Sequence, residues 1–84
     1  MKTILFYWLK TPGDIDRLEQ AVASLAPIPG ILDIEWGRPA GYDDHIMDQS
    51  FDLCVTITFE TEDGLSAMLK DPVHDEASDI FKEV

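Results

Sequence analysis

One of the two histidines of this chain lies in the segment "DPVHDE", which runs from Asp71 to Glu76. A histidine changes its charge near neutral pH, so His74 is a candidate general base or hydrogen-bonding group. The phenol of Tyr7 is the second candidate, because it could hydrogen-bond a ligand or His74. A structural role is the alternative for both. His74 would bond a loop carbonyl and anchor a helix start, and Tyr7 would pack in the core.

The protonation state of His74 stays open at this point. The positive end of a helix favours the neutral imidazole, which suits a base or an acceptor. The neighbouring carboxylates of Asp71, Asp75 and Glu76 favour the charged form instead.

The second histidine lies in an acidic segment that contains Asp43, Asp44, His45 and Asp48. Carboxylates and an imidazole could hold a divalent cation, but their spacing matches neither a calcium loop nor a zinc motif. We therefore predict a solvated acidic loop, with no metal and no cofactor. Cys54 is the only cysteine, which excludes an internal disulfide. No base lies beside it in the sequence, so we predict a packing residue, not a nucleophile.

Size and charge restrict the class of protein. Eighty-four residues with 45% hydrophobic content indicate one folded domain over residues 1–84. The net charge of −11 would repel nucleic acid and anionic membranes. No stretch approaches the roughly 20 apolar residues that span a bilayer. With no cleavable leader and a single cysteine, we predict a cytoplasmic protein that binds neither nucleic acid nor membrane.

The apolar periodicity predicts the order strand, helix, strand, strand, helix, helix. Thr3–Leu9 is apolar on both faces, which predicts a central strand covered on both sides. The following helix has an apolar face formed by Ile15, Leu18, Val22 and Leu25, and ends at "APIPG".

Two further strands are predicted over Ile31–Gly37 and Phe51–Phe59. In the first, Leu32, Ile34 and Trp36 are predicted to share a face. The second alternates strictly, with one apolar face formed by Phe51, Leu53, Val55, Ile57 and Phe59.

The C-terminal part predicts two helices. The first is short and has Leu65, Met68 and Leu69 on one face. The second begins with Asp71 as its N-cap and Pro72 at its first position. It has an apolar stripe formed by Val73, Ala77, Ile80, Phe81 and Val84.

This order predicts an α+β sandwich of the ferredoxin-like kind, with an antiparallel sheet and helices on one face. The helix-free face, which carries Ile4, Phe6 and Trp8, then needs another partner. Sheet-to-sheet packing of a second subunit is the economical solution.

Four stretches occur here in a familiar order: "TILFYWLK" near the start, "IPGILDIEWGRP" at Ile28–Pro39, "VTITFETEDGLSAML" at Val55–Leu69 and "DPVH" at Asp71–His74. Together they resemble the stress-responsive A/B barrel domain family, a branch of the dimeric α/β barrels. The last stretch is usually a His-Pro-small-His motif in that family.

The resemblance implies a homodimer in which two ferredoxin-like sheets close a barrel. We expect Ile4, Phe6, Trp8, Cys54 and Thr56 at the interface. It also implies a small pocket between sheet and helices, whose expected lining residues are Thr3, Leu5, Tyr7, Leu18, Leu53, Val55, Met68 and His74.

The chain departs from the family pattern in several places. Asp71 replaces the first histidine of the His-Pro motif, and Thr3 stands where the first strand often has a histidine. Met68 takes the place of the tyrosine that assists catalysis in the polyketide-cyclising plant members. Family members usually continue beyond the position of Val84 into a fourth strand beside the first.

Three functions are therefore open. The protein could bind a small apolar or aromatic molecule without strong catalysis, which we favour. It could be a weak cyclase or isomerase that uses His74 as base, with Tyr7 or a water as partner. It could also be a structural or stress-associated dimer with a filled pocket.

Overall fold

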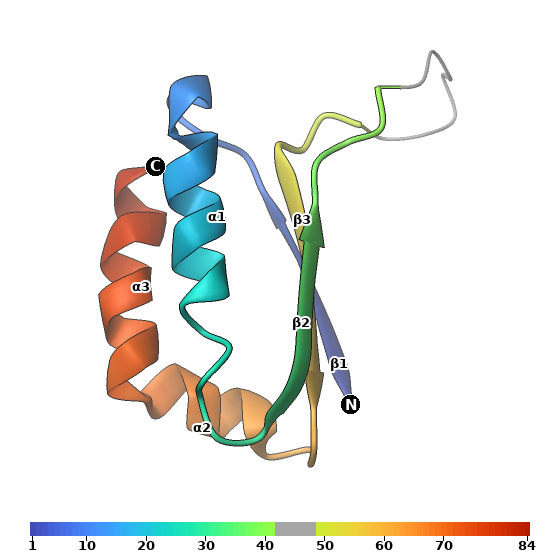
Figure 1. Ribbon diagram of the computed structural model, residues 1–84, viewed down its shortest axis with the longest axis vertical. Helices are drawn as coiled ribbons and strands as arrows, with labels where there is room; N and C mark the ends of the chain where they lie inside the picture. Colours follow the sequence, from blue (N-terminus) through green and yellow to red (C-terminus); the bar gives the residue numbers. More distant parts are fainter. Residues whose placement is uncertain (42–48) are drawn as a thin grey trace.

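Three strands form one antiparallel sheet, and the helices pack against one side of it (Figure 1). The structure, a computed structural model, describes residues 1–41 and 49–84. In chain order, the elements are β1 (Lys2–Tyr7), a short 3-10 turn (Pro12–Asp14), α1 (Ile15–Ala23), β2 (Ile31–Gly37), β3 (Leu53–Phe59), α2 (Gly64–Lys70) and α3 (Pro72–Glu83). The predicted element order and the ferredoxin-like α+β class are confirmed.

The sheet has the order β1-β3-β2, with β3 pairing antiparallel to both neighbours. The prediction that the first strand is central is wrong, because β1 lies at one edge of the described sheet. The second apolar face of β1 is not covered by any described helix. Ile4, Phe6 and Trp8 point to the helix-free side, where their side chains are 59%, 49% and 58% exposed.

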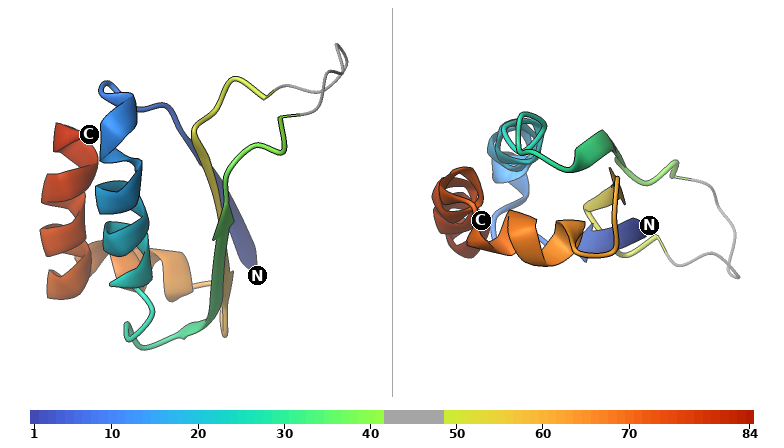
Figure 2. Two further views of the ribbon diagram at one scale, coloured as in Figure 1. Left: turned by 45° about the horizontal axis from the view of Figure 1, so that its top comes forward. Right: turned by 90° about the horizontal axis from the view of Figure 1, so that it is seen from below.

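The core forms between the alternating side chains of β3 and the helix layer. Leu53, Val55, Ile57 and Phe59 are at most 1% exposed, as their alternation predicted. They pack against the predicted inner face of α1, where Leu18 and Val22 are completely buried. Figure 2 shows α1 and α3 side by side over the sheet. The strict alternation of β3 therefore decides which side the helices cover.

A β-bulge near the start of β2 changes the predicted face of Leu32. Ile31 pairs with Phe59 and Asp33 pairs with Thr58, so Leu32 is an extra residue in the ladder. Ile31 and Ile34 consequently both pack against the core, whereas Leu32 is 64% exposed. The prediction that Leu32 shares a face with Ile34 and Trp36 is wrong for this reason.

Two more apolar residues lie away from their predicted positions. Phe51 precedes β3 and packs edge-on against Phe6, with ring centroids 5.2 Å apart. Its ring therefore joins the side chains of the helix-free side and not the inner face. In α2, Leu65 and Met68 pack in the core as predicted, but Leu69 is 52% exposed.

The start of α3 matches its sequence prediction. The Asp71 carboxylate accepts a hydrogen bond of 2.9 Å from the backbone N–H of Val73, and Pro72 occupies the first helical turn. The predicted stripe faces the core: Ala77 and Val84 are buried, and Val73, Ile80 and Phe81 pack around them. The cap therefore fixes where α3 begins, and the apolar spacing accounts for the face that packs in the core.

Gly64 provides a sharp test of this packing. A Cβ atom at Gly64 would lie 2.7 Å from the Cβ and Cδ1 atoms of Phe59. We predict that Gly64→Ala lowers the free energy of unfolding by about 1–3 kcal/mol, because Phe59 is buried and cannot move freely. Urea denaturation followed by circular dichroism measures this difference.

Gly13→Ala is the matched control, since nothing lies within 4 Å of the added atom. It should change the stability by less than about 1 kcal/mol. Equal effects of the two substitutions would contradict the packing described for Phe59 and Gly64.

Candidate functional site

Three rings from two elements meet between β1 and α3. Tyr7 ends β1 and pairs with Leu53, which directs its side chain toward the helices. His74 and Phe81 lie two turns apart on α3. The Phe81 ring centroid is 5.5 Å from that of Tyr7 and 6.5 Å from that of His74. The structure thus brings both sequence candidates to one region, with Phe81 in contact with each.

Contacts at its C-terminal end hold α3 in this position, and a cap fixes its first turn. At its C-terminal end, the backbone N–H of Lys10 donates to the carbonyl of Val84 at 2.6 Å. The Nζ of Lys10 donates to the carbonyl of Lys82, and Arg17 pairs with Glu83. At the other end, the Asp71 cap fixes the first turn. The segment that follows Tyr7 is therefore tied to the helix that carries Phe81.

The polar groups of Tyr7 and His74 make no side-chain hydrogen bond within residues 1–41 and 49–84. Within the same residues, every buried side-chain nitrogen or oxygen has a partner. The Tyr7 hydroxyl and the His74 ring nitrogens consequently reach the surface, although both residues are half-buried. Two polar groups at the surface beside an aromatic ring can orient a small molecule.

Burial of the Tyr7 side chain raises the pKa of its phenol above 10.0, because desolvation disfavours the phenolate. At neutral pH, Tyr7 is therefore a neutral hydrogen-bond donor. In the described part of the chain no hydrogen bond joins it to His74, so the two do not form a ready acid–base pair.

The other predicted pocket residues occupy the same layer. Thr3 and Leu5 are half-buried on the helix-facing side of β1, where they pair with Ile57 and Val55. The remaining four residues belong to the closely packed core and are at most 3% exposed: Leu18, Leu53, Val55 and Met68. Their role as the wall of a ligand pocket stays a prediction.

The predicted interface residues all lie on the helix-free side of the sheet. Ile4 pairs with Thr56, and Phe6 pairs with Cys54. The Phe6 and Trp8 rings are 6.5 Å apart, and the Trp8 Nε1–H donates to the Ser50 hydroxyl at 3.1 Å. Phe51 extends this cluster, which the sequence analysis missed. Ile4, Phe6, Trp8 and Phe51 are called the aromatic face below.

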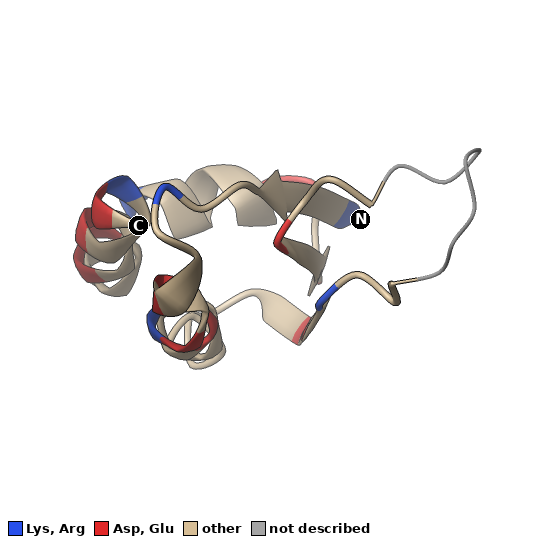
Figure 3. Cartoon of the chain, turned by 90° about the horizontal axis from the view of Figure 1, so that it is seen from above, with Lys and Arg blue, Asp and Glu red and all other residues tan. Residues whose placement is uncertain are grey.

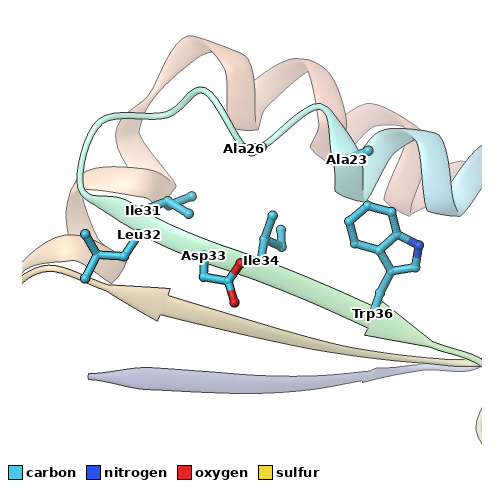
Figure 4. A pocket seen from close by; sticks show the side chains of 7 residues that line it. All are labelled: Ala23, Ala26, Ile31, Leu32, Asp33, Ile34 and Trp36. Atoms are coloured by element: carbon cyan, nitrogen blue, oxygen red, sulfur yellow. The ribbon is translucent and has the colours of Figure 1, made fainter.

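A cleft at the opposite edge of the sheet was also missed. It has a volume of about 460 Å³ and lies between β2 and the end of α1 (Figure 4). Its lining residues are Ala23, Ala26, Ile31, Leu32, Asp33, Ile34 and Trp36. The sequence contained one indication of this cleft, because Ile34 and Trp36 were predicted to lie on the same face of β2. It contained no indication of the bulge that adds Ile31 to that face.

Charged groups gather next to this cleft. Figure 3 shows acidic residues along α1 and α3. The guanidinium of Arg38 donates to Asp16 at 3.0 Å and to Glu19. The hydrogen bond that Arg38 donates to Glu19 is the largest cause that raises the pKa of the guanidinium. This ion-pair cluster ties the segment after β2 to α1.

Within residues 1–41 and 49–84, no three His, Cys, Asp or Glu side chains are placed to hold a metal ion. Asp43, Asp44, His45 and Asp48 lie outside the described residues. Among the described helices, none has the length and apolar composition needed to cross a bilayer.

The model of a family described as "Stress responsive A/B Barrel Domain" matches residues 1–84. The chain belongs to this family. No curated protein matches it significantly.

Solved structures share the fold of this chain. A crystal structure of an Arabidopsis thaliana protein matches with a TM-score of 0.78 and 23% sequence identity. The match covers 98% of this chain and 82% of the Arabidopsis chain. A Thermobifida fusca protein, described as a dimeric ferredoxin-like protein of unknown function, has a TM-score of 0.73 and 26% identity. That match covers 99% of this chain and 77% of the other. These similarities support the ferredoxin-like fold.

The raised pKa of Tyr7 predicts a pH dependence of stability. The folded state holds the phenol proton more tightly than the unfolded state, whose pKa is near 10.0. This contribution is complete below pH 10.0 and is lost as the pH rises through the folded pKa. We predict that Tyr7→Phe loses less stability than the wild type over this alkaline range.

Urea denaturation at neutral and alkaline pH measures this difference. The lysines titrate in both proteins, so only the difference between the two pH profiles reports on Tyr7. Parallel profiles would show that Tyr7 is as well hydrated in the folded state as in the unfolded chain.

Proposed function

We propose that the chain forms one A/B barrel domain that dimerises and binds a small apolar or aromatic molecule between sheet and helices. The observation that carries this proposal is the contact of Phe81 with both Tyr7 and His74, whose polar groups have no partner within the described residues. Ligand sites commonly combine apolar walls with a few polar groups that orient the ligand. The single cysteine favours a cytoplasmic location, which stays a prediction.

Catalysis by His74 has weaker support than binding. General acid–base catalysis needs the base within about 2.6–3.2 Å of the proton that it moves. It is strengthened when a further group orients the base, as in catalytic triads. No described side chain hydrogen-bonds the His74 ring, and the side chain of Met68 cannot exchange a proton. We therefore propose binding in preference to a cyclase or isomerase activity.

A structural dimer with a filled pocket is the second candidate. It is favoured by the close packing of Leu18, Leu53, Val55 and Met68, which leaves these side chains almost completely buried. Under this alternative, Tyr7 and His74 would contact only water at the surface. The ligand experiment below separates the two functions.

The aromatic face supports the proposed dimer. Monomeric proteins rarely expose large contiguous apolar patches, and here Ile4, Phe6 and Trp8 are each about half exposed on one side of the sheet. Two sheets can bury such faces by packing about 10 Å apart. The Thermobifida fusca neighbour is described as dimeric. We infer that two copies of this chain pack through their aromatic faces and close a barrel.

Phe6→Asp tests the interface. A carboxylate in the middle of the aromatic face would be desolvated in the dimer, and this costs several kcal/mol per ion. We predict that sedimentation velocity shows a dimer for the wild type and a folded monomer for Phe6→Asp at micromolar concentrations.

Leu69→Asp is the matched control, because Leu69 is 52% exposed on α2, away from this face. It should leave the dimer intact. A monomeric wild type, or a Phe6→Asp variant that stays dimeric, would refute the interface.

The proposed binding site is tested with a panel of small aromatic and polyketide-like compounds in NMR titrations. We predict that a panel member shifts the resonances of His74, Tyr7 and Phe81 together. His74→Ala should weaken that binding by about two- to tenfold, since one hydrogen bond contributes roughly 0.5–1.5 kcal/mol.

Asp79→Asn serves as the control on the same helix, since Asp79 is exposed. Its affinity should equal that of the wild type. If no compound moves these three resonances, the structural dimer is the better description of the protein.

A further inference from the structure

The cleft beside Trp36 is separate from the site of Tyr7 and His74. It lies along β2, whereas Tyr7 lies on β1 at the opposite edge of the sheet. Its volume of about 460 Å³ falls in the range of small-molecule sites, which is roughly 300–1,000 Å³. Size therefore allows a ligand here that is independent of the function proposed above.

Small and large side chains together form the cleft. In Figure 4, Ile31, Ile34 and Trp36 point from β2 toward the segment that contains Ala23 and Ala26. The bulge at Leu32 turns Ile31 to the same side as Ile34. The two alanines are too small to fill the space opposite. The floor is consequently apolar, and the Trp36 indole, 39% exposed, forms one wall.

The rim of the cleft is acidic. Asp33 lines it from β2, and in Figure 4 its carboxylate points away from the apolar floor. On the other side of Trp36, a hollow is lined by Asp16 and Glu19. Arg38 is held by these two carboxylates and lines neither space. None of the six lysines and arginines of the chain lines the cleft.

We propose that this cleft binds a small organic cation with an apolar body, such as an aryl-alkyl ammonium ion. The apolar body would occupy the space between Ile34 and Ala26. The ammonium group would lie at the rim, where the Trp36 π system and the carboxylates both attract positive charge. An anion would be repelled by these carboxylates and by the net charge of −11.

The test uses 2-phenylethylammonium, with 2-phenylethanol as neutral analogue and 3-phenylpropionate as anionic analogue. NMR follows the indole N–H of Trp36 in the wild-type protein. The cation should shift this resonance in a saturable way, with an affinity at least about threefold higher than that of the alcohol. The anion should cause no saturable shift. Added salt should weaken the binding of the cation but not that of the alcohol, because salt screens only the ionic attraction.

Three variants localise the binding. Trp36→Leu removes the π face, so the binding to this variant is followed at the backbone N–H of Ile34. Asp33→Asn removes a rim charge. Each should lower the affinity for the cation by about two- to fivefold, as expected for an exposed cation–π or ion contact. Ala26→Leu fills the cleft from an exposed position and should abolish the saturable shift without disturbing the core.

Trp8→Phe on the aromatic face, Glu62→Gln in the exposed turn before α2, and His74→Ala are the controls. All three should bind the cation as the wild type does, which keeps this test independent of the function proposed above. Equal affinity for cation and alcohol would overturn the proposal, and so would unchanged binding in Ala26→Leu. A Trp36 signal that moves with protein concentration, while the cation has no effect, would show that a second copy covers the cleft and would also overturn it.

Discussion

The pairing of β3 with both neighbouring strands is the constraint on which the rest of the structure depends. Its alternation buries Leu53 and Val55 under the helices and leaves Cys54 and Thr56 on the other side. Because side chains along a strand alternate, a slip of one residue would turn this apolar set to the wrong face. The register with β3 also directs Tyr7 toward the helices and its neighbours on β1 away from them. Both candidate surfaces therefore follow from one ladder.

The chemistry between β1 and α3 follows from how that helix is held. Its N-terminus is capped by Asp71, its last turn is tied to Lys10, and Phe81 of this helix lies against Tyr7. Within residues 1–41 and 49–84, no side chain hydrogen-bonds the imidazole of His74, so none fixes its orientation. A ring that is free at both nitrogens can donate or accept a hydrogen bond from a ligand, but it lacks the support that efficient proton transfer needs.

Patterns within one element predicted much of this fold, whereas features that depend on contacts between elements could not be predicted. The alternation of β3 and the stripe of α3 are set by spacing within one element, so both were predictable. The edge position of β1 depends on which strands pair, and the face of Leu32 depends on a bulge that only the partner strand defines. Likewise, His74 and Tyr7 could be named from the sequence, but the contact of each with Phe81 could not. The cleft was missed because empty space opposite two alanines leaves no pattern.

The helix-free side of the sheet is apolar near β1 and acidic near β2, and this difference affects how two copies would pack. Toward β1 it carries the aromatic face, whereas toward β2 it carries Asp33 and Glu35, which pair with Thr58 and Thr56. Burying four like charges between two symmetric copies would be costly without cations to balance them. Packing centred on β1 buries the aromatic side chains and keeps the acidic strand near the rim. The cleft lies on the helix-facing side of β2, beside Ala23 and Ala26, and the proposed interface lies on the helix-free side, so the two are compatible in the same molecule.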